Sequence, residues 1–246
     1  MIIDDIGIIL HLRKFGESAL IVSCFLADHG LLNGFWRPPK QKKSNGTDVL
    51  PGNLVRVRWW ARLEEQLGTY QLEAEDNIIG KIAFNKADLA LLNAVTQLLY
   101  LVLNEKEAQP QLFAKAYSLL KSLYQENLSL LEKVYCYFCF ELEVLQYTGF
   151  GIDLSKCAVT STTEDLTYIS PRTGRVVCTA VGAPYADRLF SLPEFFQRNT
   201  LPANYDELHS ALKITGYFLQ KAIANEQYRP GQAASARQQV VQLLHV

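Results

Sequence analysis

The sequence lacks the features that mark membrane, secreted and disulfide-stabilised proteins. No apolar run reaches the ~18–20 residues that cross a bilayer, and the acidic, alternating start from Met1 to Asp5 is unlike a signal peptide. The 5 cysteines among 246 residues are too few and too scattered for a disulfide scaffold. There is no low-complexity tail and no internal repeat. We therefore expect a globular protein of the reducing cytoplasm, with enough apolar residues for a sizeable core.

The motifs of several enzyme classes are missing as well. The sequence has neither a G-x-x-x-x-G-K-[ST] phosphate loop nor a G-x-S-x-G nucleophile elbow. Its 4 histidines form no i, i+4 pair and no metal-binding spacing. Cys136-Tyr-Phe-Cys139 matches C-x-x-C but lies in the most apolar segment, which favours core packing over redox chemistry. We therefore expect no enzymatic activity, no cofactor and no small-molecule substrate.

Positive charge is concentrated in one segment of a chain whose net charge is only −1. Between Gly34 and Arg62 the only acid is Asp48, and basic and aromatic residues are interleaved. Cations neutralise phosphates and flat rings stack on bases, so this pattern indicates nucleic-acid binding. The alternative is a solvated strand face beside a basic loop. The residues concerned are Arg37, Lys40, Lys42, Lys43, Arg56, Arg58 and Arg62, with Phe35, Trp36, Trp59 and Trp60.

Up to about Glu75 the pattern is that of short strands separated by glycine, proline and acidic breakers. Five short strands suit a small closed barrel of the OB-fold type. In the fourth run the residues alternate, so Trp59 is expected in the core, whereas Arg56, Arg58 and Trp60 face outward. Residues 38–53 show no periodicity and are predicted to form a long loop. The five runs are residues 7–15, 18–25, 31–36, 54–62 and 68–75.

Beyond about residue 83 the apolar period becomes helical. Asn85 is suited to cap a first helix, Pro110 to open a second, and residues 130–147 form a third that is apolar nearly all round. Asn204, with Glu207 three residues later, starts a last helix that continues to about Asn225. At about 150–180 lies an irregular insert with two expected strands, at 167–170 and 175–179.

These patterns together predict an α+β protein. An OB-fold barrel of five strands occupies residues 1–80, and an all-helical domain with a small β-hairpin insert occupies residues 81–246.

The insert carries the most specific motif. It contains Gly149-Phe-Gly-Ile-Asp-Leu-Ser-Lys-Cys157 and Tyr168-Ile-Ser-Pro-Arg-Thr-Gly-Arg-Val-Val-Cys178. Together with the opening Gly7-Ile-Ile-Leu and Gly16-Glu-Ser, these motifs closely resemble the RecO family of bacterial recombinational-repair mediators. The resemblance covers most of the chain and is weakest over residues 81–128.

One departure from the family pattern concerns metal binding. The family has a C-x-x-C on each side of the hairpin, whereas this chain has Cys157-Ala-Val-Thr160 and Cys178-Thr-Ala-Val181. Two ligands remain of the four that a closed tetrahedral zinc site needs, and threonine and valine cannot replace the others. We therefore expect a degenerate zinc-finger-like hairpin without metal, held by packing. Whether Cys157 and Cys178 lie near each other stays open.

The resemblance implies a function without nucleotide hydrolysis. RecO-like proteins bind single- and double-stranded DNA through the OB-fold and anneal complementary strands, including strands coated by single-stranded DNA-binding protein. They engage RecR and the acidic C-terminal tail of the coating protein, help to load RecA, and act in the cytoplasm at the nucleoid. On this chain the implied DNA contacts are Arg37, Lys40, Lys42, Lys43, Arg56 and Arg58 for phosphates, Trp60 for stacking, and Arg172 and Arg175 on the hairpin. Lys115, Lys121 and Lys133 are candidates for the acidic tail.

Two other functions are weighed against this one. The chain could be a protein-interaction scaffold with little DNA affinity of its own. A nuclease needs a carboxylate cluster, and Glu64-Glu65 and Glu73/Glu75/Asp76 lack an accompanying histidine or lysine at a recognisable spacing.

Overall fold

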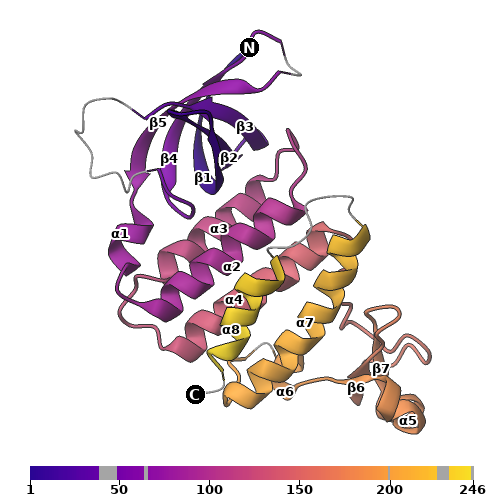
Figure 1. The fold of residues 1–246 in the computed structure, drawn as a ribbon. Helices are drawn as coiled ribbons and strands as arrows, with labels where there is room; N and C mark the ends of the chain where they lie inside the picture. Colours follow the sequence, from indigo (N-terminus) through magenta and orange to yellow (C-terminus); the bar gives the residue numbers. More distant parts are fainter. Residues whose placement is uncertain (39–48, 64–65, 199, 226–232, 245–246) are drawn as a thin grey trace. The chain divides into compact units, whose positions relative to one another are not determined.

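The computed structural model describes residues 1–38, 49–63, 66–198, 200–225 and 233–244, so the predicted contacts Lys40, Lys42 and Lys43 lie outside the described residues. The chain divides into two compact units (Figure 1). One comprises Met1–Leu128 with Pro230–Val240, and the other Ser129–Arg229 with Val241–Val246. None of the described helices combines the length and the apolar character that a membrane crossing requires.

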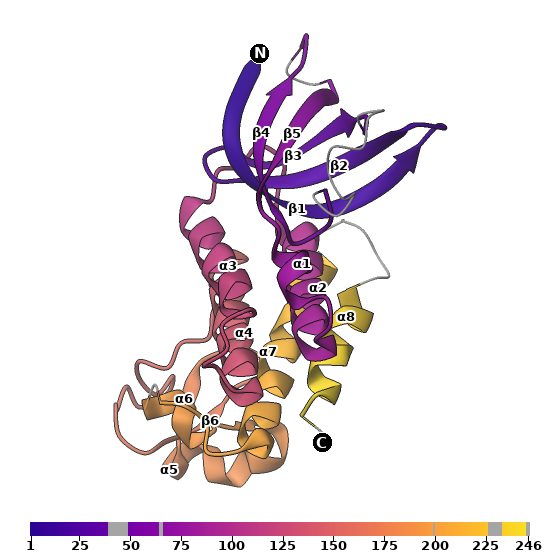
Figure 2. The same ribbon diagram turned by 90° about the vertical axis from the view of Figure 1, so that its left-hand side faces the viewer.

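Five strands at the start of the chain close into a barrel in the order β1-β2-β3-β5-β4 (Figure 2). The first strand is long and pairs with both β2 and β4, and the parallel pairing of β3 with β5 closes the barrel. This topology confirms the predicted OB-type barrel, with the first strand starting earlier and the fourth ending sooner than expected. The strands are β1 (Ile2–Phe15), β2 (Ala19–Leu26), β3 (Gly30–Trp36), β4 (Leu54–Trp60) and β5 (Gly68–Asp76).

The barrel core confirms the alternation read from β4. Val55, Val57 and Trp59 are buried inside, and Trp59 is only 1% exposed. The indole Nε1 of Trp59 donates a hydrogen bond of 3.1 Å to the backbone carbonyl of Asn33 on β3. Gly68 is required at the start of β5, since a Cβ there would lie 2.1 Å from the Trp59 ring. Trp59 is therefore a structural residue.

Three helices follow the barrel in the same unit: α1 (Ile78–Ile82), α2 (Lys86–Val102) and α3 (Pro110–Ser122). As predicted, the side chain of Asn85 caps α2 by accepting the N–H groups of Ala87 and Asp88, at 3.0 and 3.1 Å. Pro110 occupies the first turn of α3, where its missing N–H costs nothing. The short α1 was not predicted, because five residues show no helical period.

In the second unit the two long helices α4 (Leu130–Tyr147) and α7 (Tyr205–Asn225) pack against each other. Both match the predicted segments. Asn204 Oδ1 accepts the N–H of Glu207 at 3.0 Å, while the Glu207 carboxylate accepts the N–H of Ala203, so the capping-box-like start is confirmed. The helix α6 (Glu194–Arg198) of this unit was not predicted, nor was α8 (Ala233–Gln242), most of which belongs to the first unit.

The insert between α4 and α7 forms a three-stranded sheet in the order β7-β6-β8. Its strands are β6 (Leu166–Ile169), β7 (Val176–Cys178) and β8 (Phe190–Ser191). The predicted hairpin is present, but extending its second strand to Thr179 was wrong. Thr179 instead begins α5 (Thr179–Gly182), which leads into the 3-10 helix η1 (Ala183–Arg188). The third strand has two residues, too few for a recognisable alternation.

Candidate nucleic-acid interface

The first candidate surface is the outward side of β4, which carries three predicted DNA contacts. Arg56, Arg58 and Trp60 are all exposed. The strand register places them beside outward residues of β1 and β5. We call the whole surface the β4 face: Ile2, Asp4 and Ile6 on β1, Arg56, Arg58 and Trp60 on β4, and Gln71, Glu73 and Glu75 on β5.

Carboxylates balance the arginines of the β4 face. Arg56 Nη2 lies 2.9 Å from Glu75 Oε2, and Arg58 Nε lies 3.7 Å from Asp4 Oδ1. Glu73 stands directly opposite Arg56 across the strand pair. A phosphate that binds here has to displace an ion pair and approach three carboxylates, which opposes binding.

The second candidate surface lies at the end of the β1–β2 hairpin. Arg13, Ile21 and Phe35 form one row across β1, β2 and β3, so their side chains share a face of the sheet. Phe15 is half exposed, and its ring lies 4.9 Å from that of Phe35. We call this the hairpin-end surface and define it by Arg13, Phe15, Phe35 and Arg37, which directly follows β3, together with Lys14, whose side chain points to the other side of the hairpin end.

The helix α2 covers only part of this side of the sheet. The ring of His11 on β1 stacks on Tyr100 of α2, with centroids 4.6 Å apart. His11 pairs with Ser23 of β2, and Ser23 pairs in turn with Asn33 of β3 and donates a hydrogen bond to its side chain. The side-chain amide of Asn33 donates a hydrogen bond to the carboxylate of Glu105, just after the helix. Beyond this row no ring contact or ion pair among the described residues ties the sheet to α2. The hairpin-end surface lies nearer the hairpin turn, and its residues Arg13, Phe15 and Arg37 are exposed.

The charge of the hairpin-end surface is positive. Arg13, Lys14 and Arg37 are exposed, and the described part of the chain shows no ion pair to any of them. One carboxylate, Glu17, lies in the hairpin turn. Cations that outnumber the carboxylates and lie beside partly exposed aromatic rings are suited to phosphates and unstacked bases.

Sequence reasoning did not place Arg13, Lys14 and Phe15 among the candidate DNA contacts. The segment does carry the same interleaving of cations and rings that was noticed after Gly34. Its link with Phe35 and Arg37 depends on the pairing of three strands, which composition alone does not reveal.

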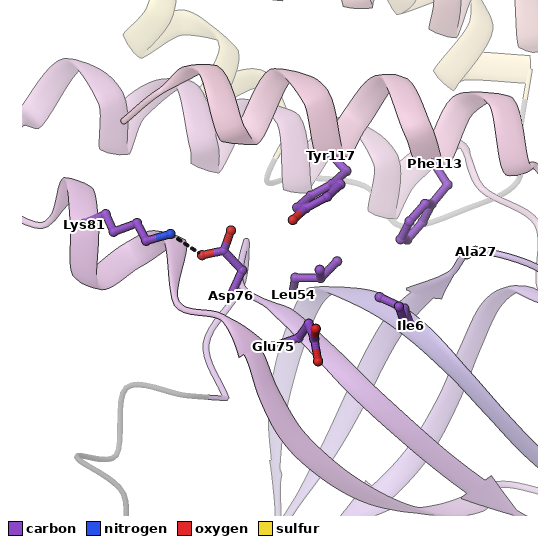
Figure 3. Close-up of a pocket in the computed structure, with 8 residues that line it drawn as sticks. All are labelled: Ile6, Ala27, Leu54, Glu75, Asp76, Lys81, Phe113 and Tyr117. Carbon is purple, nitrogen blue, oxygen red and sulfur yellow. Dashed lines mark hydrogen bonds and ion pairs between the residues drawn. The ribbon is translucent and has the colours of Figure 1, made fainter. Parts of the chain in front are cut away.

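An open groove of about 460 Å³ lies between the barrel and α3 (Figure 3). Its apolar wall comes from both elements, but two carboxylates face it. The ammonium of Lys81 is bound to Asp76 at 2.6 Å and lies 4.1 Å above the ring of Tyr124. This groove is therefore unsuited to a polyanion. The lining residues are Ile6, Ala27, Leu54, Glu75, Asp76, Lys81, Phe113 and Tyr117.

The lysines considered for an acidic peptide differ in accessibility. Lys133, a candidate for the acidic tail, is only 8% exposed within α4 and is therefore poorly accessible to a peptide. Lys115 and Lys121 are exposed on α3, and Lys121 Nζ lies 5.4 Å above the ring of Tyr117. An acidic peptide can therefore reach the two α3 lysines.

The two arginines of the insert occupy different environments. Arg172 is exposed in the turn between β6 and β7. Arg175 Nε lies 3.4 Å from Asp153 Oδ2, and hydrogen bonds from Ser155 lower the pKa of that carboxyl, with a smaller contribution from Arg175. DNA contact at these arginines stays a prediction.

The four positions that correspond to the family's cysteines lie together. Cys157, Cys178 and the partly buried Val181 belong to one apolar cluster, and Thr160 Oγ1 lies 3.6 Å from Cys178 Sγ. Only two of the four side chains are metal-ligating types. Among the described residues no group of three or more histidines, cysteines and acids is placed to hold a metal ion.

The chain is similar in sequence to two family models and to several known proteins. Residues 1–76 match the family model "Recombination protein O N terminal", and residues 86–229 match "Recombination protein O C terminal". The chain is 39% identical over 220 residues to the DNA repair protein RecO of Ruegeria sp. (strain TM1040), covering 89% of each chain. It is 35% identical over 233 residues to that of Rickettsia bellii (strain OSU 85-389), covering 94% of this chain and 92% of the relative. The relative from Sinorhizobium medicae (strain WSM419) is 34% identical over 236 residues, with 95% and 91% covered.

Proposed function

The chain belongs to the RecO family of DNA repair proteins, and we propose that it binds single- and double-stranded DNA through its barrel and anneals complementary strands. We further propose that it acts on strands coated by single-stranded DNA-binding protein and, with RecR, helps to load RecA. The role in DNA repair follows from the family.

The observation that carries the proposal is the hairpin-end surface. Arg13, Lys14 and Arg37 provide three cations, and Phe15 and Phe35 provide neighbouring rings. The segment after β3 continues with three more lysines in the sequence, Lys40, Lys42 and Lys43. Binding through phosphates and base faces requires no particular sequence, as annealing of arbitrary complements demands.

The mechanism is electrostatic. If the three cations and the three following lysines contact phosphates, the slope of log K against log salt is about −4 on a single strand. A surface that holds two strands screens their repulsion and raises the local concentration of complements. Annealing then needs no hydrolysis of ATP, and we propose that the chain is not an enzyme.

The partner contacts are proposed from the family resemblance and from charge. The acidic tail of single-stranded DNA-binding protein is attracted to exposed lysines, of which Lys115 and Lys121 lie on α3. The alternative, a scaffold with little DNA affinity, is favoured by the balanced charge of the β4 face.

Annealing of complementary oligonucleotides, bare and coated with single-stranded DNA-binding protein and without ATP, tests the proposal. Wild type should anneal both substrates, and Arg13→Glu/Arg37→Glu should lose annealing. Lys86→Glu/Lys213→Glu changes the net charge equally at exposed sites elsewhere and should retain it. Wild type that binds the coating protein yet does not anneal would establish the scaffold function. Cleavage of labelled DNA with added metal ions would contradict the non-enzymatic proposal.

A further inference from the structure

The sulfur atoms of Cys157 and Cys178 lie within one small network of hydrogen bonds. Cys157 Sγ accepts the backbone N–H of Thr160 at 3.5 Å and that of Cys178 at 3.4 Å. Thr160 contacts the second sulfur as well, since its Oγ1 lies 3.6 Å from Cys178 Sγ. Both thiols are buried in the same cluster with Val177. The two cysteines left open by the sequence are therefore neighbours.

We propose that Cys157 and Cys178 form a reversible oxidation site, at which a hydroperoxide converts the two thiols into a disulfide. The Cys157 thiolate attacks a peroxide oxygen, so that an S–O bond forms, the O–O bond breaks and hydroxide (or alkoxide) leaves. The sulfur of Cys178 then attacks the sulfenic acid of Cys157, the S–S bond forms, and the S–O bond breaks. The proton of the Cys178 thiol leaves with the hydroxyl group as water. A dithiol reductant restores both thiols by exchange.

The surroundings of Cys157 assign it the attacking role. Its sulfur accepts the backbone N–H groups of Thr160 and Cys178, and donors placed in this way stabilise a thiolate. The thiolate is the nucleophile in peroxide chemistry. Cys178 lies next to both Thr160 and Cys157, which suits the residue that attacks the sulfenic acid and so forms the disulfide.

Cys24 of the barrel and Cys136 of α4 lie in different surroundings. Burial, with a smaller contribution from Asp5, raises the pKa of Cys24, which is enclosed in the barrel core. Burial, followed by the charge of Glu132, also raises the pKa of Cys136. Peroxide should therefore select Cys157.

Cys157 is fully buried, so a small oxidant has to reach it through local opening of the exposed turn that follows it. Two backbone hydrogen bonds close this turn, from Ser161 N–H to the Cys157 carbonyl at 3.0 Å and from Cys157 N–H to the Thr162 carbonyl at 2.8 Å. Val159 and Thr160 within the turn are exposed. Cytosolic disulfides are commonly transient and redox-sensing, which suits a site that opens locally rather than a permanent cross-link.

The test is titration of the full-length reduced protein with hydrogen peroxide, followed by peptide mapping and by labelling of the remaining thiols. A cross-linked peptide pair that contains Cys157 and Cys178, lost on treatment with dithiothreitol, is expected. Cys157 should disappear a few-fold faster than Cys136, because the sulfur of Cys157 accepts two backbone N–H groups that stabilise the attacking thiolate.

Three variants separate the roles. Cys178→Ser should accumulate a sulfenic acid at Cys157 that dimedone traps, whereas Cys157→Ser should leave Cys178 reduced. Cys136→Ser/Cys139→Ser, the matched control, should form the disulfide at the wild-type rate. Oxidation that never joins Cys157 to Cys178, or that reaches Cys136 first, would overturn the proposal. Far-UV circular dichroism of each variant shows that it is folded.

Discussion

The guanidinium of Arg56 on β4 is bound to the carboxylate of Glu75 on β5, with Nη2 and Oε2 2.9 Å apart. The pair lies on a part of the barrel that sequence alone assigns to DNA. An exposed ion pair of this kind contributes at most about 1 kcal/mol to folding. Its consequence for binding is larger, because the same carboxylate that holds Arg56 repels phosphate.

Removing the carboxylates of the β4 face should increase its affinity for DNA. In Asp4→Asn/Glu75→Gln, Arg56 and Arg58 lose the two carboxylates that pair with them and become available to phosphates, although Glu73 remains opposite Arg56. We expect tighter binding of an oligo-dT strand and a log–log salt slope steeper by about 1.4, which corresponds to two added contacts. Fluorescence anisotropy at several salt concentrations measures both quantities. Glu126→Gln, at an exposed site after α3, is the control, and an unchanged slope in the double variant would contradict the expectation.

The adjacent tryptophans of β4 should differ in their contribution to stability. Trp59 fills the barrel core, so Trp59→Ala should lower the free energy of unfolding by about 3–5 kcal/mol. Trp60 is 41% exposed, and Trp60→Ala should cost under about 1 kcal/mol. Urea denaturation followed by circular dichroism compares the two. Equal losses would show that the inward and outward assignment is wrong.

The ring of Phe15 is expected to stack on a base of single-stranded DNA. Phe15→Ala should weaken binding of a single strand by about 1–3 kcal/mol and leave binding of a duplex nearly unchanged, because duplex bases are already stacked. Phe84, fully exposed before α2, provides the matched control for loss of a surface ring. Equal effects of Phe15→Ala on both kinds of DNA, measured by anisotropy, would exclude stacking.

The insert should bind zinc once the two absent ligands are restored. Thr160 and Val181 already lie in the cluster with Cys157 and Cys178, so Thr160→Cys/Val181→Cys supplies four thiolates. We expect one zinc ion per chain by metal analysis, and thermal unfolding that shifts downward when a chelator is added. Wild type serves as the control without zinc. A double variant that folds but binds no metal would show that the four positions do not converge.

The barrel and the long helices could be predicted because their patterns are local. The alternation of Val55, Val57 and Trp59 determines the inner face of β4, and Asn85 and Asn204 determine where two helices begin. The partners of the site residues could not be predicted in the same way. Glu75 meets Arg56 only through the register of β4 with β5, and Arg13 meets Phe35 only through three paired strands.

In the insert, too, the sequence predicts a local turn but not the contacts between segments that lie apart in the chain. Its hairpin follows from the turn residues around Gly174, whereas β8 has two residues and is defined by pairing with β6. The proximity of Cys157 and Cys178 depends on the fold of the intervening segment, which the spacing in sequence does not determine.

Binding of an oligo-dT strand by two charge-reversed variants tests the central claim most directly. The claim is that the hairpin-end surface, and not the β4 face, holds the DNA. Arg13→Glu/Arg37→Glu and Arg56→Glu/Arg58→Glu change the net charge equally and alter exposed side chains of the same barrel. The account predicts that the first loses most of its affinity and flattens the salt slope by about 1.4, whereas the second stays within a few-fold of wild type. Loss of binding in the second variant, with the first unaffected, would contradict it.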